Sequence, residues 1–408
     1  MIRITPPLPV VAKGLAGFLV EMSATHARID WMGDHADSNI NKISVSRSSA
    51  KHSDFDVRPE GQSIYRFDEN SLTEVQDLMH ALRKSQHIDL CATQDVEHSA
   101  KDNGFSSIKI PVVSLPEVNW SEVSTEKTFL GQTFGAPIVI TGMTGGVAQG
   151  TMINERLAHC AVTHKIPMGV GSQRMALENS ALEGIFKLKD KFPGLFLIGN
   201  VGIGQLHGPH FLDFCQRAVD MIHANALAIH VNVLQELIQV EGDRDFRGII
   251  EKISAIQSKL KVPVIVKEVG AGLDAITAKK LWDTGIKYFD VGGAGGTSWA
   301  HIEGLRASDE LIRRRGALFR DWGLTTAEAL KTVRSALPAA AIIATGGIRD
   351  GLTVLKAVYS GADMAGIGLP LMKAAIEHDD AATKLMAAII DELKIAMMVS
   401  GIRISPKN

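Results

Sequence analysis

The chain has few cysteines, few aromatic residues and little net charge, and each shortage excludes a class of protein. Its three cysteines, Cys91, Cys160 and Cys215, are too widely spaced for a disulfide scaffold or a cysteine zinc site. A net charge of -2 provides no general attraction to nucleic acids or membrane surfaces. No apolar run approaches the roughly 20 residues that cross a bilayer. We therefore expect a protein of the reducing cytoplasm, with neither a nucleic-acid nor a membrane partner.

Glycine, by contrast, is abundant, and many of the 38 glycines follow short apolar runs. In residues 341–351 and again in 363–370, an apolar run leads into a glycine turn and then into a helical stretch. Backbone N–H groups at such turns and at helix N-termini bind phosphate without side-chain charge. In (β/α)8 barrels the phosphate site lies in the loops after strands 7 and 8. The two segments therefore predict a phosphorylated ligand at that position.

From residue 137 onward, short apolar runs alternate with longer amphipathic stretches, which predicts alternating strands and helices. The expected strands are 137–141, 166–170, 195–199, 227–231, 262–267, 287–291, 340–344 and 364–367. The expected helices include 153–163, 212–222, 249–260, 275–283, 326–336, 352–360 and a terminal helix over 383–399. This repetition predicts an α/β fold of the (β/α)8 or TIM-barrel type. A doubly wound open sheet is the alternative, but units of equal length with continuous apolar strands favour closure.

Residues 1–70 differ in composition from the rest of the chain. The stretch 38–54 is rich in Ser, Asn, His and Asp and has few apolar residues, which disfavours a packed core. We expect an N-terminal extension over 1–70 that is partly disordered. A helix should follow from Ser71, which has capping-box spacing to Glu74, and run towards Leu82. This helix would open a segment over 71–136, and the barrel with its terminal helix would occupy 137–408.

Polar and glycine-rich residues follow the expected strands at the barrel end where catalytic groups lie. Lys267 closes an apolar strand and is either a lysine that reaches solvent or a cation directed at an electron-rich ring or an anion. Ser172 and Asn200, at neighbouring strand ends, would donate hydrogen bonds to the same ring. A single glycine turn needs no special explanation, but glycines at six strand ends would let a large flat ligand lie against the backbone.

The densest polar cluster is His230, Asn232, Gln235 and Glu236. It is either a solvated polar loop or a functional site. In the second case Glu236 would bind Mg²⁺, which typically uses one or two carboxylates together with substrate phosphates. His230 and Asn232 would then hold phosphate oxygens or the reacting group.

Cations occur both upstream of the barrel and within it. The run Arg83-Lys84-Ser85-Gln86-His87 is either a basic helix end that complements the helix dipole or part of an anion site. Arg174 offers a further cation for bidentate phosphate contact. Arg313-Arg314-Arg315 fits a solvated helix face, and His207 and His210 have no third ligand nearby that would suggest a metal.

Seven motifs thus follow one another along about Ala81 to Val399. They are Arg83-Lys84-x-x-His87, Thr141-Gly-Met-Thr-Gly-Gly146, Met168-Gly-Val-Gly-Ser-Gln-Arg174, His230-x-Asn232-x-x-Gln235-Glu236, Val266-Lys-Glu-Val-Gly270, Gly295-Gly-Thr-x-Trp299 and Gly346-Gly-Ile-Arg349. Each motif alone is weak, but all seven in this order are specific. Together they resemble the type 2 isopentenyl diphosphate isomerases, the flavin-dependent class.

The resemblance implies FMN at the barrel mouth, with its phosphate on the loops after strands 7 and 8. It implies FMN contacts from Met143, Thr144, Ser172, Asn200, Lys267, Thr297, Gly347, Arg349 and Leu369. It implies a diphosphate substrate held by Arg83, Lys84, His87, Arg174, His230, Asn232 and Gln235. Glu236 would bind Mg²⁺, and the segment 71–136 would cap the substrate.

The implied reaction converts isopentenyl diphosphate to dimethylallyl diphosphate, a step of isoprenoid biosynthesis without net redox change. An unactivated alkene is a poor base, so the shift needs a strong acid–base device. The family's flavin works in its reduced form, with the N5 region as proton carrier and NADPH only as its reductant. Gln235, His230 and Lys267 would be catalytic, Lys267 by favouring the anionic reduced ring. The family's barrels commonly assemble as homo-tetramers or octamers.

Two other functions are compatible with the same motifs. An FMN-barrel oxidase or dehydrogenase of small hydroxy acids commonly needs a basic histidine near the C-terminal half, and no similar loop precedes Gly346. A non-catalytic flavin-binding protein would be favoured by the loss of Gln235 or Glu236, and both are present.

Overall fold

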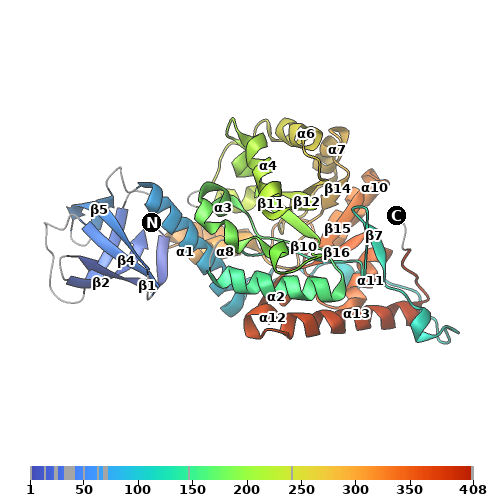
Figure 1. Ribbon diagram of the computed structural model, residues 1–408. Helices are drawn as coiled ribbons and strands as arrows, with labels where there is room; N and C mark the ends of the chain where they lie inside the picture. The colour runs from blue at the N-terminus through green and yellow to red at the C-terminus, as the bar shows by residue number, and fades with distance from the viewer. Residues whose placement is uncertain are drawn as a thin grey trace.

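A closed barrel of eight parallel strands, surrounded by helices, dominates the computed structural model (Figure 1). The structure describes residues 2–405 apart from 13–14, 23–25, 32–41, 49–50, 62–63, 68–71, 146–147 and 240–241, with side chains from residue 82 onward except residue 148. In chain order the barrel strands are β9 (Ile138–Ile140), β10 (Met168–Gly169), β11 (Leu197–Gly202), β12 (Ala226–Val231), β13 (Val264–Glu268), β14 (Tyr288–Asp290), β15 (Ala341–Thr345) and β16 (Met364–Ile367). Pairing of β16 with β9 closes the ring. Each strand coincides with an expected one, so the barrel is confirmed and the open sheet is excluded.

The strands are apolar because both of their faces are covered. Every residue of β9 and β11 is buried, as expected for a parallel sheet with helices outside and packed side chains inside. At the amino ends of the strands, a hairpin of β7 (Lys127–Phe129) and β8 (Gln132–Phe134) covers the barrel. Phe134 of this hairpin packs edge-on against Phe196, with 5.1 Å between ring centroids. This hairpin, which the sequence did not reveal, leaves the carboxyl ends as the accessible end of the barrel.

The helices follow the expected pattern, with additions at the barrel mouth. They are α1 (Leu72–Thr93), α2 (Ala148–His164), α3 (Arg174–Glu178), α4 (Phe211–Ile222), α5 (Val233–Ile238), α6 (Ile249–Lys259), α7 (Ala275–Asp283), α8 (Trp299–Arg306), α9 (Glu310–Leu318), α10 (Thr326–Ala336), α11 (Gly351–Tyr359), α12 (Leu369–Glu377) and α13 (Ala381–Ser400). Short 3-10 helices occupy η2 (Phe105–Ser107), η3 (Trp120–Glu122), η4 (Ser180–Ile185), η5 (Leu188–Asp190) and η6 (Ile203–Leu206). The expected helices, including the terminal one, correspond to α2, α4, α6, α7, α10, α11 and α13. The sequence did not reveal α3, α5 and α8, which follow strand ends and are too short to show a clear helical period. The run Arg313-Arg314-Arg315, expected on a helix face, lies in α9.

Local capping explains where several helices begin. At the start of α10, the Thr325 side chain accepts the Glu328 N–H and Glu328 caps in return, which forms a capping box. Asp274 caps α7 and Asp350 caps α11 in the same way, through the N–H of the third helical residue. The expected end of the first helix near Leu82 is wrong, because α1 continues to Thr93. Ser71, its expected cap, lies outside the described residues.

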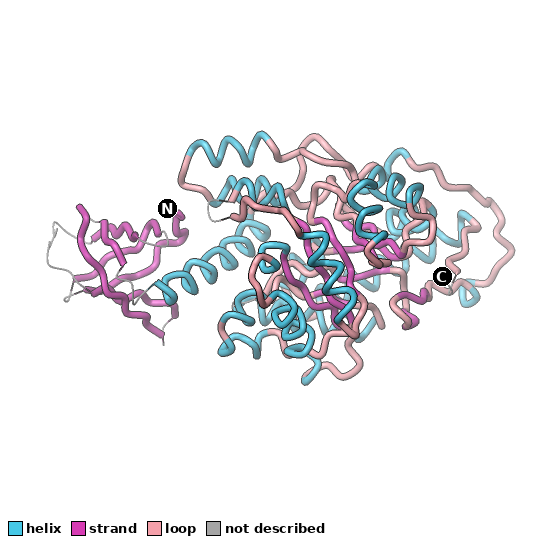
Figure 2. Tube along the Cα trace, turned by 90° about the horizontal axis from the view of Figure 1, so that it is seen from above, coloured by secondary structure: helices cyan, strands magenta, loops and turns pink. Residues whose placement is uncertain are grey.

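Six antiparallel strands precede α1, where the composition of residues 1–70 had suggested an extension of partial order. They are β1 (Ile2–Ala12), β2 (Leu15–Met22), β3 (His26–Trp31), β4 (Lys42–Ser48), β5 (Lys51–Gly61) and β6 (Ile64–Phe67), closed in the order β1-β2-β3-β6-β5-β4. β3 shows the alternation that a half-buried strand requires, with apolar residues at every second position. Figure 2 shows α1 extending from this small barrel towards the large one. The partial order of 1–70 and the division at 70 and 136 stay predictions.

In the part of the chain that the structure describes, every helix is too short or too polar to cross a membrane.

The contact between α8 and α9 depends on two glycines. A Cβ on Gly316 would lie 2.5 Å from the Gly304 Cα and 2.7 Å from the Ala300 carbonyl oxygen. The helix backbones therefore meet at a distance that no side chain permits. Because α8 follows the loop after β14, this contact fixes one side of the barrel mouth.

We expect Gly316→Ala to force α9 away from α8 and to lower the free energy of unfolding by about 1–3 kcal/mol. Urea or thermal unfolding measures the loss. Gly208→Ala is the matched control, since a Cβ there meets no atom within 4 Å. Equal stability of the two variants would show that the helix contact can relax without cost.

Candidate active site

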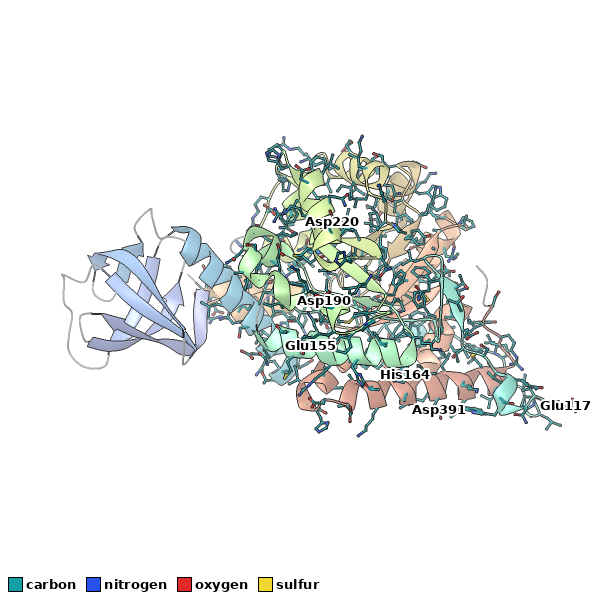
Figure 3. All side chains as sticks on the ribbon, in the orientation of Figure 1. Glu117, Glu155, His164, Asp190, Asp220 and Asp391 are labelled. Atoms are coloured by element: carbon teal, nitrogen blue, oxygen red, sulfur yellow. The ribbon has the colours of Figure 1, made fainter. Side chains whose placement is uncertain are left out.

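The carboxyl ends of the barrel strands border an open cavity, whose empty space of about 1210 Å³ includes solvent at its mouth. Cationic side chains from α1 and α3 form one part of its wall, and polar side chains from β11, β12, β13 and α5 form another. Glycine-rich loops after β14, β15 and β16 supply bare backbone on the remaining side. Figure 3 labels Asp190, Asp220 and Asp391 on the outer elements of the barrel; all three are exposed, and none of them lines this cavity.

The two predicted phosphate loops lie together in the cavity wall. Gly346 and Gly347 have φ angles of 125° and 71°, which favour glycine. A Cβ on Gly296 would lie 2.5 Å from the Gly347 nitrogen, so these loops also need glycine for close approach. Nearby, Gly368 precedes the first turn of α12, which begins at Leu369. The arrangement offers backbone N–H groups and a helix N-terminus to an anion.

Arg349 adds a cation to these loops. Its Nη1 donates to the Gly347 carbonyl at 2.7 Å, and its Nη2 pairs with the carboxylate of Glu97. Asn103 Nδ2 donates to the same Gly347 carbonyl at 2.6 Å. The chain segment around Glu97 and Asn103 therefore crosses the barrel rim and holds the glycine loop in place.

A chain of hydrogen bonds fixes His230 at the end of β12. Gln173 Oε1 accepts from the Asn200 N–H at 2.8 Å, and Asn200 Nδ2 donates to the Val170 carbonyl at 3.0 Å. The remaining Asn200 Oδ1 is an acceptor, so the His230 Nδ1 at 2.8 Å carries the proton. The Nε2 atom of His230 is then free only to accept.

Burial, followed by the charge of Lys267, lowers the pKa of His230 to about 3. The imidazole is therefore neutral near pH 7. Lys267 itself is 9% exposed, which excludes the alternative of a lysine that reaches solvent. Its Nζ donates to the Glu268 carbonyl at 3.3 Å, and it lies at the cavity floor beside His230.

The cations of α1 project from the middle of the helix. Because α1 runs to Thr93, Arg83 and Lys84 do not cap a helix end, and that alternative is wrong. Burial, followed by the charge of Arg83, lowers the pKa of Lys84 to about 7. Burial also lowers the pKa of His87 to about 4. The protonated, charged forms of these side chains are therefore unfavourable in this wall until an anion binds.

Glu303 on α8 connects these residues, and the sequence analysis did not single it out. Its Oε1 accepts from His87 Nε2 at 3.0 Å and from Gln235 Nε2 at 2.9 Å, and its Oε2 pairs with Arg306. Burial would raise the pKa of Glu303, but Arg306 and His87 outweigh it and hold the pKa below the usual range. The side chain is 1% exposed, so this is an ionised carboxylate inside the protein. In the sequence, Glu303 could have been noticed only because it lies one helical turn after Trp299, the last residue of one of the seven motifs.

Glu236 is held in one orientation by two hydrogen bonds. Its Oε1 accepts from Asn232 Nδ2 at 2.8 Å, and its Oε2 accepts from the Asp243 N–H at 3.0 Å. Among the residues that the structure describes, no three His, Cys, Asp or Glu side chains come together as a metal site. A hard cation at Glu236 would therefore take its other ligands from a bound phosphate and water, which is typical of Mg²⁺.

The cavity wall contains every predicted site residue except Thr144. Thr144 is 3% exposed and lies behind the wall, where its carbonyl accepts the Gly171 N–H at 3.0 Å. Gly146, the end of its motif, lies outside the described residues. The wall also includes polar residues that sequence reasoning missed: Glu97, Gln205, Gln239 and Glu268.

The residues fit a phosphorylated ring such as FMN. The glycine loops form a cradle that a Cβ would fill, and Lys267 supplies a cation at the floor. The Thr141 Oγ1, on the cavity wall, is buried without a hydrogen-bond partner. A polar ligand edge would satisfy this atom.

The chain has close curated relatives. Residues 219–405 match the family model described as FMN-dependent dehydrogenase. The isopentenyl-diphosphate delta-isomerase of Nostoc sp. is 43% identical over 319 residues, which are 78% of this chain and 91% of that protein. The enzyme of the same name from Stutzerimonas stutzeri is 40% identical and covers 78% and 92%. That of Rickettsia bellii is 41% identical and covers 79% and 94%.

Solved structures of mandelate oxidase share the fold. A complex with 3,3-difluoro-2-hydroxy-3-phenylpropionic acid has a TM-score of 0.52 at 18% identity and covers 80% of this chain and 94% of that chain. A mutant in complex with benzaldehyde gives a TM-score of 0.52 at 21% identity. At this identity the likeness is one of fold alone. The curated relatives, at 40–43% identity over 91–94% of their own length, show that the chain belongs to the type 2 isopentenyl-diphosphate delta-isomerase family of enzymes.

Proposed function

We propose that this protein converts isopentenyl diphosphate to dimethylallyl diphosphate, with reduced FMN as acid–base cofactor and Mg²⁺ at the diphosphate. The observation that carries the proposal is the composition of one cavity, which is lined both by Arg83, Lys84 and Arg174 and by a glycine cradle. Such a wall suits two phosphorylated molecules, one of them the cofactor. The names of the curated relatives support the same reaction.

FMN would be held at its phosphate by Gly347, Arg349 and the start of α12. Met143, Ser172, Asn200 and Thr297 line the cavity where the ring would lie. When bound in its reduced form, FMN supplies a proton donor and acceptor to the alkene. We further propose NADPH as the reductant of FMN, not consumed in each cycle, and a homo-oligomeric enzyme.

Lys267 would act on the ring through its charge. It is a buried cation at the end of β13 and donates to a main-chain carbonyl. An ammonium in such surroundings favours an anionic ligand strongly, because little water screens it. Its role would be to stabilise the anionic form of the reduced ring.

The diphosphate would meet cations and one neutral histidine. Arg83 and Arg174 stay charged at all relevant pH values, whereas Lys84 gains its proton near pH 7. His230 can donate to a phosphate oxygen only after its Nε2 takes up a proton, because its Nδ1 proton is engaged by Asn200. Mg²⁺ at Glu236 would neutralise part of the remaining phosphate charge.

Gln235 would hold a defined orientation beside the alkene. Its Nε2 donates to Glu303 at 2.9 Å, and its Oε1 accepts from Asn232 Nδ2 at 3.4 Å. The amide therefore cannot exchange its two ends without breaking a bond to an ionised carboxylate. A fixed amide backed by a charged acceptor is suited to relay a proton on one side of the substrate.

A hydroxy-acid oxidase is the second candidate, because the family model that matches residues 219–405 is described as FMN-dependent dehydrogenase. Two arginines and a lysine around one cavity wall exceed what a single carboxylate requires. The decisive experiment is anaerobic: purified protein, FMN, dithionite, Mg²⁺ and isopentenyl diphosphate in D2O, followed by NMR. Deuterated dimethylallyl diphosphate that depends on reduced flavin supports the isomerase. Reduction of FMN by a hydroxy acid, without alkene isomerisation, supports the oxidase.

We expect Gln235→Ala to lower kcat by about 100- to 1000-fold, since an acid–base group contributes 10²–10⁴. FMN affinity, measured by quenching of flavin fluorescence, should change less than twofold. Gln216→Ala on the exposed face of α4 is the control and should retain full turnover. Unchanged turnover in Gln235→Ala would remove this residue from the mechanism.

We expect Glu236→Gln to abolish the effect of Mg²⁺ on binding of inorganic diphosphate. Titration calorimetry with and without Mg²⁺ should show at least a tenfold enhancement in the parent protein and none in the variant. Without Mg²⁺ the variant should bind at least as tightly, because a negative charge has been removed. Glu310→Gln, at an exposed position of α9, should behave as the parent. Full Mg²⁺ enhancement in Glu236→Gln would place the ion elsewhere.

We expect binding of inorganic diphosphate to take up a proton at Lys84 above pH 7. The pKa of Lys84 is about 7 in the free protein, and a bound anion raises it. Affinity should therefore be highest below pH 7 and fall by up to tenfold per pH unit above it. Calorimetry at pH 8 in buffers of different ionisation enthalpy counts the protons. Lys84→Arg, which is always charged, should take up about one proton fewer than the parent; an equal count would show that Lys84 is already charged.

A further inference from the structure

Three titratable side chains lie side by side on neighbouring barrel strands. His230 of β12 is in register with Lys267 of β13, and Lys267 is in register with Asp290 of β14. Register partners in a parallel sheet point to the same face. Lys267 and Asp290 both line a smaller cavity between the barrel strands. The row therefore faces the barrel interior.

Asp290 is a carboxylate in apolar surroundings. It is 4% exposed, and most of the smaller cavity around it is formed by aliphatic side chains and backbone, with Val139, Ile198, Ala228, Ile265 and Ile343 among them. Its Oδ1 accepts from the Gly292 N–H at 3.2 Å. Burial of a carboxylate is unfavourable unless a cation offsets its charge. Burial raises the pKa of Asp290, and the charge of Lys267 is the strongest influence in the opposite direction.

The other polar neighbours of Lys267 offer little negative charge with which its ammonium group could pair. His230 is neutral near pH 7, as its pKa of about 3 shows. The carboxylate of Glu268 is occupied elsewhere, since its Oε2 accepts the N–H groups of the next four residues at 2.5–3.0 Å. Asp290, which accepts a single loop N–H, is thus the acidic neighbour whose charge is less engaged by backbone groups than that of Glu268.

We propose that Asp290 is the buried counter-ion of Lys267. Its negative charge offsets that of the ammonium below the barrel mouth, and so limits how strongly this cation stabilises an anionic ring bound above it. Asp290 does not line the larger cavity, so it acts through Lys267 as a positioning residue. The charge interaction proposed between the two side chains would exist in the free protein; only its effect on a reduced flavin rests on the proposed function.

The first test measures the pair without any ligand. Lys267→Met should leave Asp290 as an unpaired buried charge and lower the Tm of the cofactor-free protein strongly. The double variant K267M/D290N should recover most of that loss, because neither charge then remains. Lys267→Arg keeps the charge and should lose much less than Lys267→Met. Additive effects of the two single changes in this double-mutant cycle would overturn the pairing.

The second test measures FMN affinity in two redox states. Asp290→Asn keeps the shape and the acceptor for Gly292 but releases the Lys267 charge. Reduced FMN should then bind about tenfold more tightly relative to oxidised FMN, which for a two-electron couple is an upward shift of about 30 mV. In the Lys267→Met background the same change should produce little shift. An equal shift in both backgrounds, or none in either, would overturn the proposal.

Asp213→Asn, on the exposed face of α4, is the matched control for a lost carboxylate and should shift neither Tm nor the redox ratio. Neither test contains isopentenyl diphosphate. A protein without isomerase activity would still report on the ion pair, so failure of the proposed function and failure of this inference are separate results.

Discussion

The closure of the parallel barrel is the constraint on which the rest of the structure depends. Pairing of β16 with β9 completes the ring and sends the carboxyl ends of eight strands to one rim. The β7–β8 hairpin covers the other end. Residues more than 200 positions apart along the chain, such as Arg83 and Gly347, therefore line the same cavity. Because the barrel's backbone hydrogen bonds run between strands, loops at the rim are free to differ and to carry the chemistry.

Electrostatics at the rim depends on a small number of buried carboxylates. Glu303 is ionised inside the protein and binds His87 and Gln235. It thereby links α1, which precedes the barrel, to α5, which follows β12. Lys84 and His87 nevertheless have lowered pKa values, because burial outweighs the single acidic partner. Burial disfavours the charged forms of these side chains. A bound anion would stabilise them, so the wall is suited to bind an anion.

Buried charges also determine the electrostatics one layer deeper in the barrel. His230, Lys267 and Asp290 form a row in which a neutral group, a cation and an acid are neighbours on three strands. Asn200 fixes the proton of His230 on Nδ1, and burial keeps the ring neutral. Residues in contact with the barrel core thus determine the charge at the floor of the cavity. Residues of α1 and α8 determine the charge of its walls.

The sequence by itself determined the periodic part of this protein. Apolar runs at regular spacing identified all eight strands, because burial on both faces leaves a continuous apolar segment. Glycine turns identified the phosphate loops, since positive φ at Gly346 and Gly347 and close approach at Gly296 exclude a side chain. The order of the motifs identified the family. Almost every site residue that these motifs predicted lines one cavity.

Only the tertiary structure decided which side chains are partners. His87 and Glu303 are 216 residues apart, and no local pattern connects them. The ionised state of Glu303, the tautomer of His230 and the register of Asp290 with Lys267 all arise from contacts between separate strands and helices. The six strands before α1 and the β7–β8 hairpin were missed for a related reason, because antiparallel strands are stabilised by cross-strand partners that a single segment does not show. Periodicity and turn chemistry are local and can be read along the chain, whereas charge state and hydrogen-bond partners depend on what the fold brings together.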